Sequence, residues 1–304
     1  MFSYRHAFHA GNHADVLKHL VLVAILRHLT QKPTALQVID THAGAGLYRL
    51  DNAQAHTSAE ADDGILRLVN MINCAKSGKG IQSGSAALND YVDLVKGFNP
   101  SGGWTVYPGS PFLIQHLLGD RDRLKLFELH PTDIKLLTGN IDQLKAGRQV
   151  AILREDGFEG LKKFLPPPSR RGLVLCDPSY ELKTDYTRVV KMTTDALQRF
   201  ATGTYMIWYP NISRLDAQEL PRKLWNLSIR CKRPWLHCSL DVGSTVSPSS
   251  GTGAENVRPG LSASGLFVIN PPYTLRAALK EALPELVRLL GRDSSARFSL
   301  DAGE

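Results

Sequence analysis

Four short apolar runs in this chain of 304 residues end in acidic residues, at Asp40, Glu128, Asp156 and Asp177. The first of them is followed by a Gly-x-Gly turn at residues 44–46. Such a turn lets the backbone approach a nucleotide-like cofactor, with the N–H groups of a helix start close by. The carboxylate of Glu128 could accept hydrogen bonds from a ribose. Because an apolar core does not hold carboxylates without partners, the pattern predicts a ligand site.

The same runs predict the elements that position these residues. Short stretches rich in Val, Ile and Leu alternate with helix-like segments, which is typical of a parallel sheet buried on both faces. The last two stretches lack a clear helix between them and are joined by a Ser-, Gly- and Pro-rich loop, which indicates a terminal antiparallel hairpin. We therefore expect an α/β fold, a Rossmann-like doubly wound sheet with ligands at the carboxyl ends of its strands. Its seven predicted strands are 36–40, 124–129, 150–154, 172–177, 204–209, 229–240 and 265–270.

The segment between the first two predicted strands is longer than a crossover needs, at about seventy residues. Apolar residues recur at helical spacing over 65–72 and again over 88–95. The spacing predicts a small inserted helical subdomain at 51–103. The main domain is then expected to comprise 1–50 and 104–304.

Composition excludes several classes of protein. With 43% hydrophobic residues the chain is not disordered, and its apolar stretch at 20–26 is far shorter than the ~20 residues that a bilayer needs. Arg5, His6 and His9 interrupt any secretory signal. The four cysteines form no C-x-x-C pair and are expected to be free thiols in a reducing cytoplasm. The net charge of +7 is compatible with a polyanionic partner.

The series of strand ends resembles that of class I S-adenosylmethionine-dependent methyltransferases. Asp177-Pro178-Ser179-Tyr180 in particular resembles the Asp-Pro-Pro-Tyr motif of methyltransferases that act on the amino group of adenine. That nitrogen is a poor nucleophile, because its lone pair is delocalised into the ring. Asp177 and the carbonyl of Pro178 would accept its two N–H bonds, and the ring of Tyr180 would stack on a base turned out of its helix. Ser179 departs from the motif by replacing a proline that stiffens the turn and donates nothing to the chemistry.

A second tetrapeptide, Asn270-Pro271-Pro272-Tyr273, matches the general motif more closely. It follows the seventh predicted strand, whereas the catalytic motif of this fold follows the fourth. Choosing it would also leave Asp177 unexplained. We therefore predict that catalysis depends on Asp177.

The first nineteen residues, MFSYRHAFHAGNHADVLKH, narrow the resemblance. They are similar to the start of the RlmJ family, bacterial enzymes that methylate N6 of an adenine in 23S ribosomal RNA. Further similar stretches are 40–46, 107–111, 128–131, 169–172 and 199–205, and the resemblance weakens only in the insertion and after Pro272. It implies S-adenosylmethionine as the methyl donor, 23S ribosomal RNA as the partner, a monomeric cytoplasmic protein, and neither metal nor membrane.

The resemblance also implies roles for single residues. Lys18 and His19 would close over the cofactor, Glu128 would hold its ribose, and Tyr4 would lie near the RNA. Asp177 would contact both the cofactor's surroundings and the target amine. The other implied cofactor contacts are His42 and Ser110 toward its amino-acid end, Gly44 in the glycine turn, and Asp156 and Gly157 at its adenine.

Several alternatives stay open. The catalytic motif is shared with DNA adenine-N6 methyltransferases, and Ser179 could mark a non-catalytic, methyltransferase-like RNA-binding or assembly protein. The spacing of His6, His9 and His13 suggests a metal site, although Asn12 as a helix N-cap explains that segment equally well. An RNA-facing patch or merely a solvated surface could arise from Arg170, Arg171, Arg222, Lys223, Arg230, Lys232 and Arg233.

Overall fold

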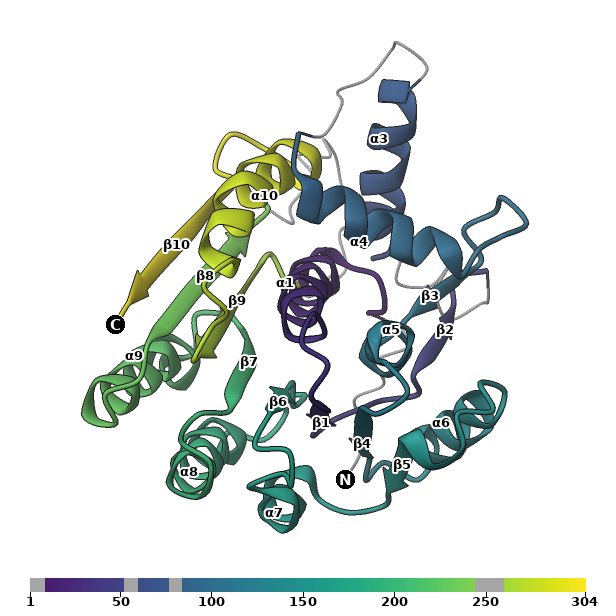
Figure 1. Ribbon diagram of the computed structural model, residues 1–304. Helices are drawn as coiled ribbons and strands as arrows, with labels where there is room; N and C mark the ends of the chain where they lie inside the picture. Colours follow the sequence, from purple (N-terminus) through teal and green to yellow (C-terminus); the bar gives the residue numbers. More distant parts are fainter. Residues whose placement is uncertain (1–8, 52–59, 77–83, 244–259) are drawn as a thin grey trace.

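A computed structural model describes residues 9–51, 60–76, 84–243 and 260–304. Its centre is a mostly parallel sheet of eight strands in the order β10-β8-β9-β7-β6-β1-β4-β5, with helices on both faces (Figure 1). Five neighbouring strands are parallel, and β9 is antiparallel to both β7 and β8. The strands of this sheet are β1 (Gln37–Asp40), β4 (Arg123–Phe127), β5 (Val150–Leu153), β6 (Gly172–Cys176), β7 (Thr204–Pro210), β8 (Trp235–Asp241), β9 (Ala263–Ile269) and β10 (Arg297–Gly303).

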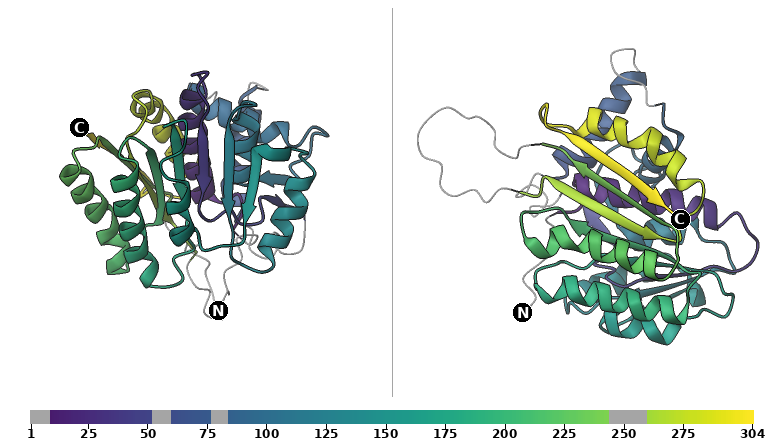
Figure 2. Two further views of the ribbon diagram at one scale, coloured as in Figure 1. Left: turned by 60° about the horizontal axis from the view of Figure 1, so that its bottom comes forward. Right: turned by 90° about the vertical axis from the view of Figure 1, so that its left-hand side faces the viewer.

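The doubly wound α/β sheet and its terminal hairpin are confirmed, but the sheet has eight strands and not seven. The additional strand, β10, pairs antiparallel with β8 at the edge of the sheet, and the right-hand view of Figure 2 shows it in yellow above the green strands. Its sequence, RFSLDAG, is polar and half-exposed, so it lacks the apolar run by which the other strands were recognised. The strand predicted at 229–240 begins only at Trp235, because the preceding amphipathic helix continues to Arg230.

The helices divide between the two faces of the sheet. One hydrophobic cluster joins the sheet to α1 (His13–Leu29), α5 (Ser110–Leu117), α6 (Asp133–Asp142) and α10 (Leu275–Leu290). A second cluster joins the opposite face to α7 (Gly157–Gly160), α8 (Thr184–Arg199) and α9 (Leu215–Arg230) (Figure 1). Within the described residues, no helix combines the length and apolarity that a membrane span requires.

Helix α1 is buried almost all round its circumference, because other helices cover the side that faces away from the sheet. It starts at an N-cap that the sequence predicted, where the Asn12 side chain accepts a hydrogen bond from the backbone N–H of Asp15. Its polar first turns, with Asp15, Lys18 and His19, are therefore held inside the protein. This burial brings α1 to the same cavity as the strand ends.

The segment predicted as an insertion contains a π-helical turn (Asp62–Leu66), α3 (Arg67–Lys76) and α4 (Ala86–Gly97). Helices α3 and α4 pack against α10, and α4 also packs against α1. Their buried side chains, such as Leu68 and Tyr91, belong to the hydrophobic cluster that contains α1. A separate two-stranded sheet of β2 (Leu47–Arg49) and β3 (Val106–Pro108) joins the two ends of this segment to each other.

Candidate active site

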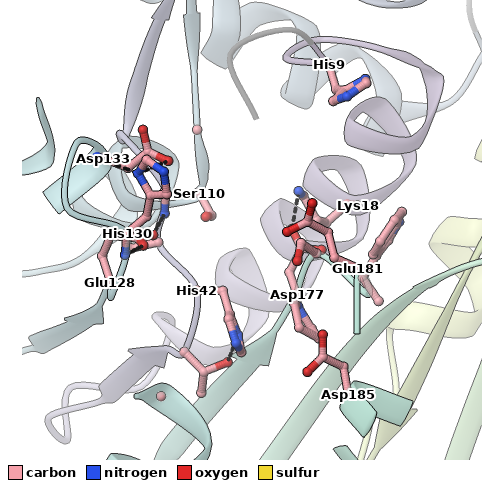
Figure 3. Close-up of a pocket in the computed structure, with 18 of the residues that line it drawn as sticks. His9, Lys18, His42, Ser110, Glu128, His130, Asp133, Asp177, Glu181 and Asp185 are labelled. Atoms are coloured by element: carbon pink, nitrogen blue, oxygen red, sulfur yellow. Dashed lines mark hydrogen bonds and ion pairs between the residues drawn. The ribbon is translucent and has the colours of Figure 1, made fainter. Parts of the chain in front are cut away.

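A cavity of about 770 Å³ opens at the carboxyl ends of the parallel strands (Figure 3). The register explains the convergence, since Asp40 at the end of β1 pairs with Leu126 of β4 and Leu175 of β6. The carboxylates that follow these strands therefore meet at one edge of the sheet. The cavity is lined by all but two of the predicted site residues, namely Lys18, His19, His42, Gly44, Ser110, Glu128, Asp156, Gly157, Asp177 and Pro178.

The two exceptions are Tyr4, which lies outside the described residues, and Tyr180. The motif predicts that the Tyr180 ring lies in the cavity and stacks on the target base. In the structure the ring does not line the cavity. The side chain is 4% exposed, packs against Tyr186, and donates a hydrogen bond from its hydroxyl to the carbonyl of Trp208 at 2.6 Å. Its backbone φ of +53° turns the side chain inward, an orientation that the motif alone does not reveal.

The glycine turn after β1 depends on residues without a side chain. Gly44 has φ +60°, and a Cβ there would collide with the hydroxyl of Tyr48. The Gly44 N–H donates to the carboxylate of Glu128 at 2.8 Å. On the same edge, a Cβ at Gly157 would collide with the carbonyl of Thr41, so α7 closely approaches the end of β1. Both glycines line the cavity, and close packing of protein atoms around them leaves no room for a side chain.

Glu128 organises two loops at once. Its Oε2 accepts the Gly44 N–H and its Oε1 accepts the His130 N–H at 2.7 Å, a contact that Figure 3 shows at the cavity wall. Burial raises the pKa of this carboxyl group, although these hydrogen bonds oppose the effect. A carboxylate has about four lone-pair positions, so Glu128 can still accept bonds from ligand hydroxyls.

His42, Asp156 and Arg188 form one corner of the cavity. Burial lowers the pKa of His42 to about 4, so its ring is neutral near pH 7, and it lies edge-on to Phe158 at 4.8 Å. The carboxylate of Asp156 accepts the Phe158 N–H at 2.9 Å and pairs with Arg188, whose guanidinium lies 4.3 Å from the centre of the Phe158 ring. This corner combines flat apolar surface with hydrogen-bonding groups, which suits a heteroaromatic ring.

Ser110 and Asp40 form a buried pair beside the glycine turn. The Ser110 hydroxyl donates to Asp40 Oδ2 at 2.6 Å, and the His42 N–H donates to Asp40 Oδ1 at 3.2 Å. Burial raises the pKa of Asp40 to about 6 despite these bonds. Asp40 therefore holds Ser110 and the turn in place from beneath the cavity.

Lys18 lies between two carboxylates. Its ammonium is 2.7 Å from Asp15 and also pairs with Asp177, and Figure 3 shows Lys18 and Asp177 pointing toward each other. Burial alone would lower the pKa of Lys18, but the charges of Asp15 and Asp177 outweigh it and the pKa is raised. Asp177 and Pro178 follow β6, the fourth strand predicted from the sequence. The carboxylate proposed to receive the amine is thus accompanied by a buried cation.

The second tetrapeptide lies at the opposite end of the sheet. Strand β9 runs antiparallel to β7, so its last residues and Asn270 point away from the cavity. Asn270 has φ +53°, and its side-chain amide donates to the carbonyls of Ala201 and Gly203 at 2.9 and 2.6 Å. Asn270 therefore stabilises a turn. Of the two tetrapeptides, the one that begins at Asp177 lines the cavity.

Sequence reasoning missed several lining residues, among them Glu60, Arg188 and Trp208. Arg188 and Trp208 carry no motif, and only the packing of α8 and β7 against the cavity identifies them. The sequence predicted Asp15 only as a residue of the first helical turn. Its i,i+3 spacing from Lys18 could also have indicated the ion pair that these two residues form.

Two other sequence hypotheses can be placed. Of the three histidines in the predicted metal pattern, His6 lies outside the described residues, His9 pairs with Glu60 at 2.9 Å, and His13 is buried. The described part of the chain holds no group of three His, Cys, Asp or Glu able to bind a metal. In the hypothetical basic patch, Arg171 donates to carbonyls at and after the end of α1. Arg222 and Lys223 pair with Glu219. These three cations thus have intramolecular partners.

Comparison with known proteins identifies the family. The family model described as "Ribosomal RNA large subunit methyltransferase D, RlmJ" matches residues 33–300. The chain is 42% identical over 286 residues to the Ribosomal RNA large subunit methyltransferase J of Escherichia coli K12, covering 94% of this chain and 93% of that protein. The Haemophilus influenzae protein of the same name is 39% identical over 302 residues, which are 99% of this chain and 98% of that protein. 

A crystal structure of the protein LPL1258 from Legionella pneumophila resembles this one with a TM-score of 0.80 and 30% identity, covering 97% of this chain and 99% of that chain. The similarity therefore extends over nearly the whole length of both chains. The family model and the two relatives confirm the family resemblance that the first nineteen residues and the strand ends had indicated. The chain is a member of the RlmJ family of ribosomal RNA large subunit methyltransferases.

Proposed function

We propose that this protein transfers a methyl group from S-adenosylmethionine to N6 of an adenine in 23S ribosomal RNA, acting as a monomer in the cytoplasm. The observation that carries the proposal is the position of Asp177 and Pro178, which face the large cavity directly after β6. Membership of the RlmJ family supports the same reaction.

The residues that line the cavity fit S-adenosylmethionine. Gly44 and Gly157 line the cavity, the carboxylate of Glu128 can accept bonds from ribose hydroxyls, and the corner at His42 and Asp156 suits an adenine ring. When bound, this cofactor supplies a methyl group on a positively charged sulfur.

Asp177 would hold the target amine. Its carboxylate and the Pro178 carbonyl would accept the two N–H bonds, which returns electron density to the nitrogen as the new N–C bond forms. The methylated nitrogen then loses one proton, and Asp177 is the adjacent acceptor. The Tyr180 ring is buried and does not line the cavity. The Trp208 ring does line it, and the centre of this ring lies 6.0 Å from the Lys18 ammonium.

The experiment is a methyl-transfer assay on 23S ribosomal RNA transcripts and on hairpins of RNA and DNA with the same sequence, with the modified base mapped by mass spectrometry. We expect N6-methyladenine in the RNA and little in the DNA. Methylation of the DNA hairpin at an equal rate would favour DNA as the substrate. Cofactor binding without methylation of either nucleic acid would favour the non-catalytic alternative.

Asp177→Ala tests the catalytic assignment. Loss of one polar group that acts in the transition state costs about 2.7–4 kcal/mol, so kcat should fall by about 10²–10³-fold. The variant should retain much of its affinity for S-adenosylmethionine, measured by calorimetry, since the other proposed cofactor contacts remain. Turnover near that of the parent would move the catalytic role to another residue.

A further inference from the structure

Asp15, Lys18 and Asp177 form a nearly buried group of three charges. Their side chains are 2%, 5% and 16% exposed, respectively. A single ammonium is therefore shared by two carboxylates, one from the same helix and one from the end of β6. A buried cation needs an anionic partner, and one carboxylate is enough to balance the charge of Lys18. The presence of a second buried carboxylate therefore calls for an explanation.

The two oxygens of Asp15 have different partners. Oδ2 accepts the backbone N–H of Gly11 at 2.9 Å, and Oδ1 lies 2.7 Å from the Lys18 ammonium. The first contact resembles a capping box, in which the third residue of a helix reaches back to an N–H before it. Fastening the start of α1 thus accounts for one oxygen only. The other oxygen acts on Lys18.

Substrate binding changes the demand on Asp177. According to the proposed function, on which this inference rests, Asp177 must accept an N–H bond from the incoming amine. The Lys18 ammonium donates to Asp177 Oδ2, and its positive charge weakens this carboxylate as an acceptor for the N–H of the amine. A Lys18 held by Asp15 can keep its charge paired while Asp177 turns to the amine.

We propose that Asp15 is a positioning residue for methyl transfer. Its carboxylate holds the ammonium of Lys18, so that Asp177 can accept the N–H bond of the target amine. Without the Asp15 charge, the buried ammonium would pair with Asp177 alone and would weaken that carboxylate as an acceptor for the amine. The predicted defect is therefore in kcat, and binding of S-adenosylmethionine should be affected much less.

Asp15→Asn is the appropriate substitution, because the amide oxygen can still accept from Gly11 while the negative charge is lost. We expect kcat to fall at least about tenfold, with the Kd for S-adenosylmethionine within about threefold of the parent. Asp15→Glu, which keeps the charge, should recover part of the rate. If Asp15→Asn does not fold, Asp15→Ser takes its place with the same expected result, because its hydroxyl can also accept from Gly11.

A matched control is Asp122→Asn. Asp122 is also a buried carboxylate that accepts two backbone N–H bonds, from Leu36 and Gly119, but it lies at the opposite edge of the sheet. This substitution should lower the melting temperature without changing kcat per folded molecule. An equal kcat loss in Asp122→Asn and Asp15→Asn would assign the effect to stability alone and overturn the proposal.

A double-mutant cycle with Lys18→Met gives the decisive readout. If Asp15 acts through Lys18, adding Asp15→Asn to Lys18→Met should have almost no further effect on kcat. Fully additive losses would show that Asp15 acts independently, contrary to the inference. Failure of the parent protein to methylate RNA would instead contradict the proposed function, so the two failures are distinguishable.

Discussion

Glu128 illustrates at the scale of one residue how a strand-end carboxylate serves both the fold and the ligand. It accepts N–H bonds from Gly44 and His130, and it lines the cavity. We predict that Glu128→Ala weakens binding of S-adenosylmethionine by about 1.5–3 kcal/mol, the usual value for hydrogen bonds to a charged group. This corresponds to about a ten- to hundredfold increase in Kd.

Calorimetric titration of the cofactor measures the change. Glu159→Ala is the control, because Glu159 lies on the neighbouring α7 and its exposed side chain pairs with Lys162 outside the cavity. The assignment of Glu128 to the ribose fails if its variant binds the cofactor as tightly as the parent does.

The sequence could predict which residues share the site wherever the order and direction of the strands alone bring those residues together. Asp40, Glu128 and Asp177 follow parallel strands, whose carboxyl ends must meet at one edge. The side-chain orientation of Tyr180 could not be predicted, because it depends on a positive φ and on packing against Tyr186. The Lys18–Asp177 pair joins residues 159 positions apart, and only the course of α1 across the sheet reveals it.

At the scale of elements, buried parallel strands were predictable because each is a continuous apolar run. β6 is an example, with four of its five residues buried. The edge strand β10 and the short pair β2 and β3 have no such run, since pairing partners rather than composition define them. Strand direction decides which of the two tetrapeptides lies at the cavity. Because β9 is antiparallel to β7, Asn270 lies at the edge of the sheet remote from Asp177.

This reversal of strand direction gives a prediction for Asn270→Ala. The substitution removes two hydrogen bonds to backbone carbonyls and places alanine at φ +53°, so we expect a loss of about 1–3 kcal/mol in the free energy of unfolding. Methyl transfer per folded molecule should equal that of the parent. Denaturant titration and the methylation assay measure the two quantities, and Asn270→Gly, which tolerates the positive φ, should lose less stability. A selective loss of kcat in the alanine variant would return Asn270 to the catalytic site.

At the scale of the whole molecule, buried histidines make stability depend on pH. Burial lowers the pKa of His13 and of His42 from 6.5 to about 4, and it also lowers that of His237. The unfolded chain therefore binds more protons than the folded protein between pH 6.5 and pH 4. Stability should fall as pH decreases through this window. For His13 the difference corresponds to about 3 kcal/mol when the window is fully crossed.

Four groups oppose this trend. The pKa of His9 is raised by its hydrogen bond to Glu60. Burial raises the pKa of three carboxyl groups, Asp40 (to about 6), Glu128 and Asp185, so all four groups favour the folded state as the solution is acidified. The three lowered histidines outweigh them, and we predict a net decrease in melting temperature from pH 7 to pH 5. Thermal unfolding across this range measures the slope, which should be shallower in His13→Gln because the buried titrating ring is gone. A melting temperature that rises on acidification, or an unchanged slope in His13→Gln, would show that burial of these rings does not control the acid response.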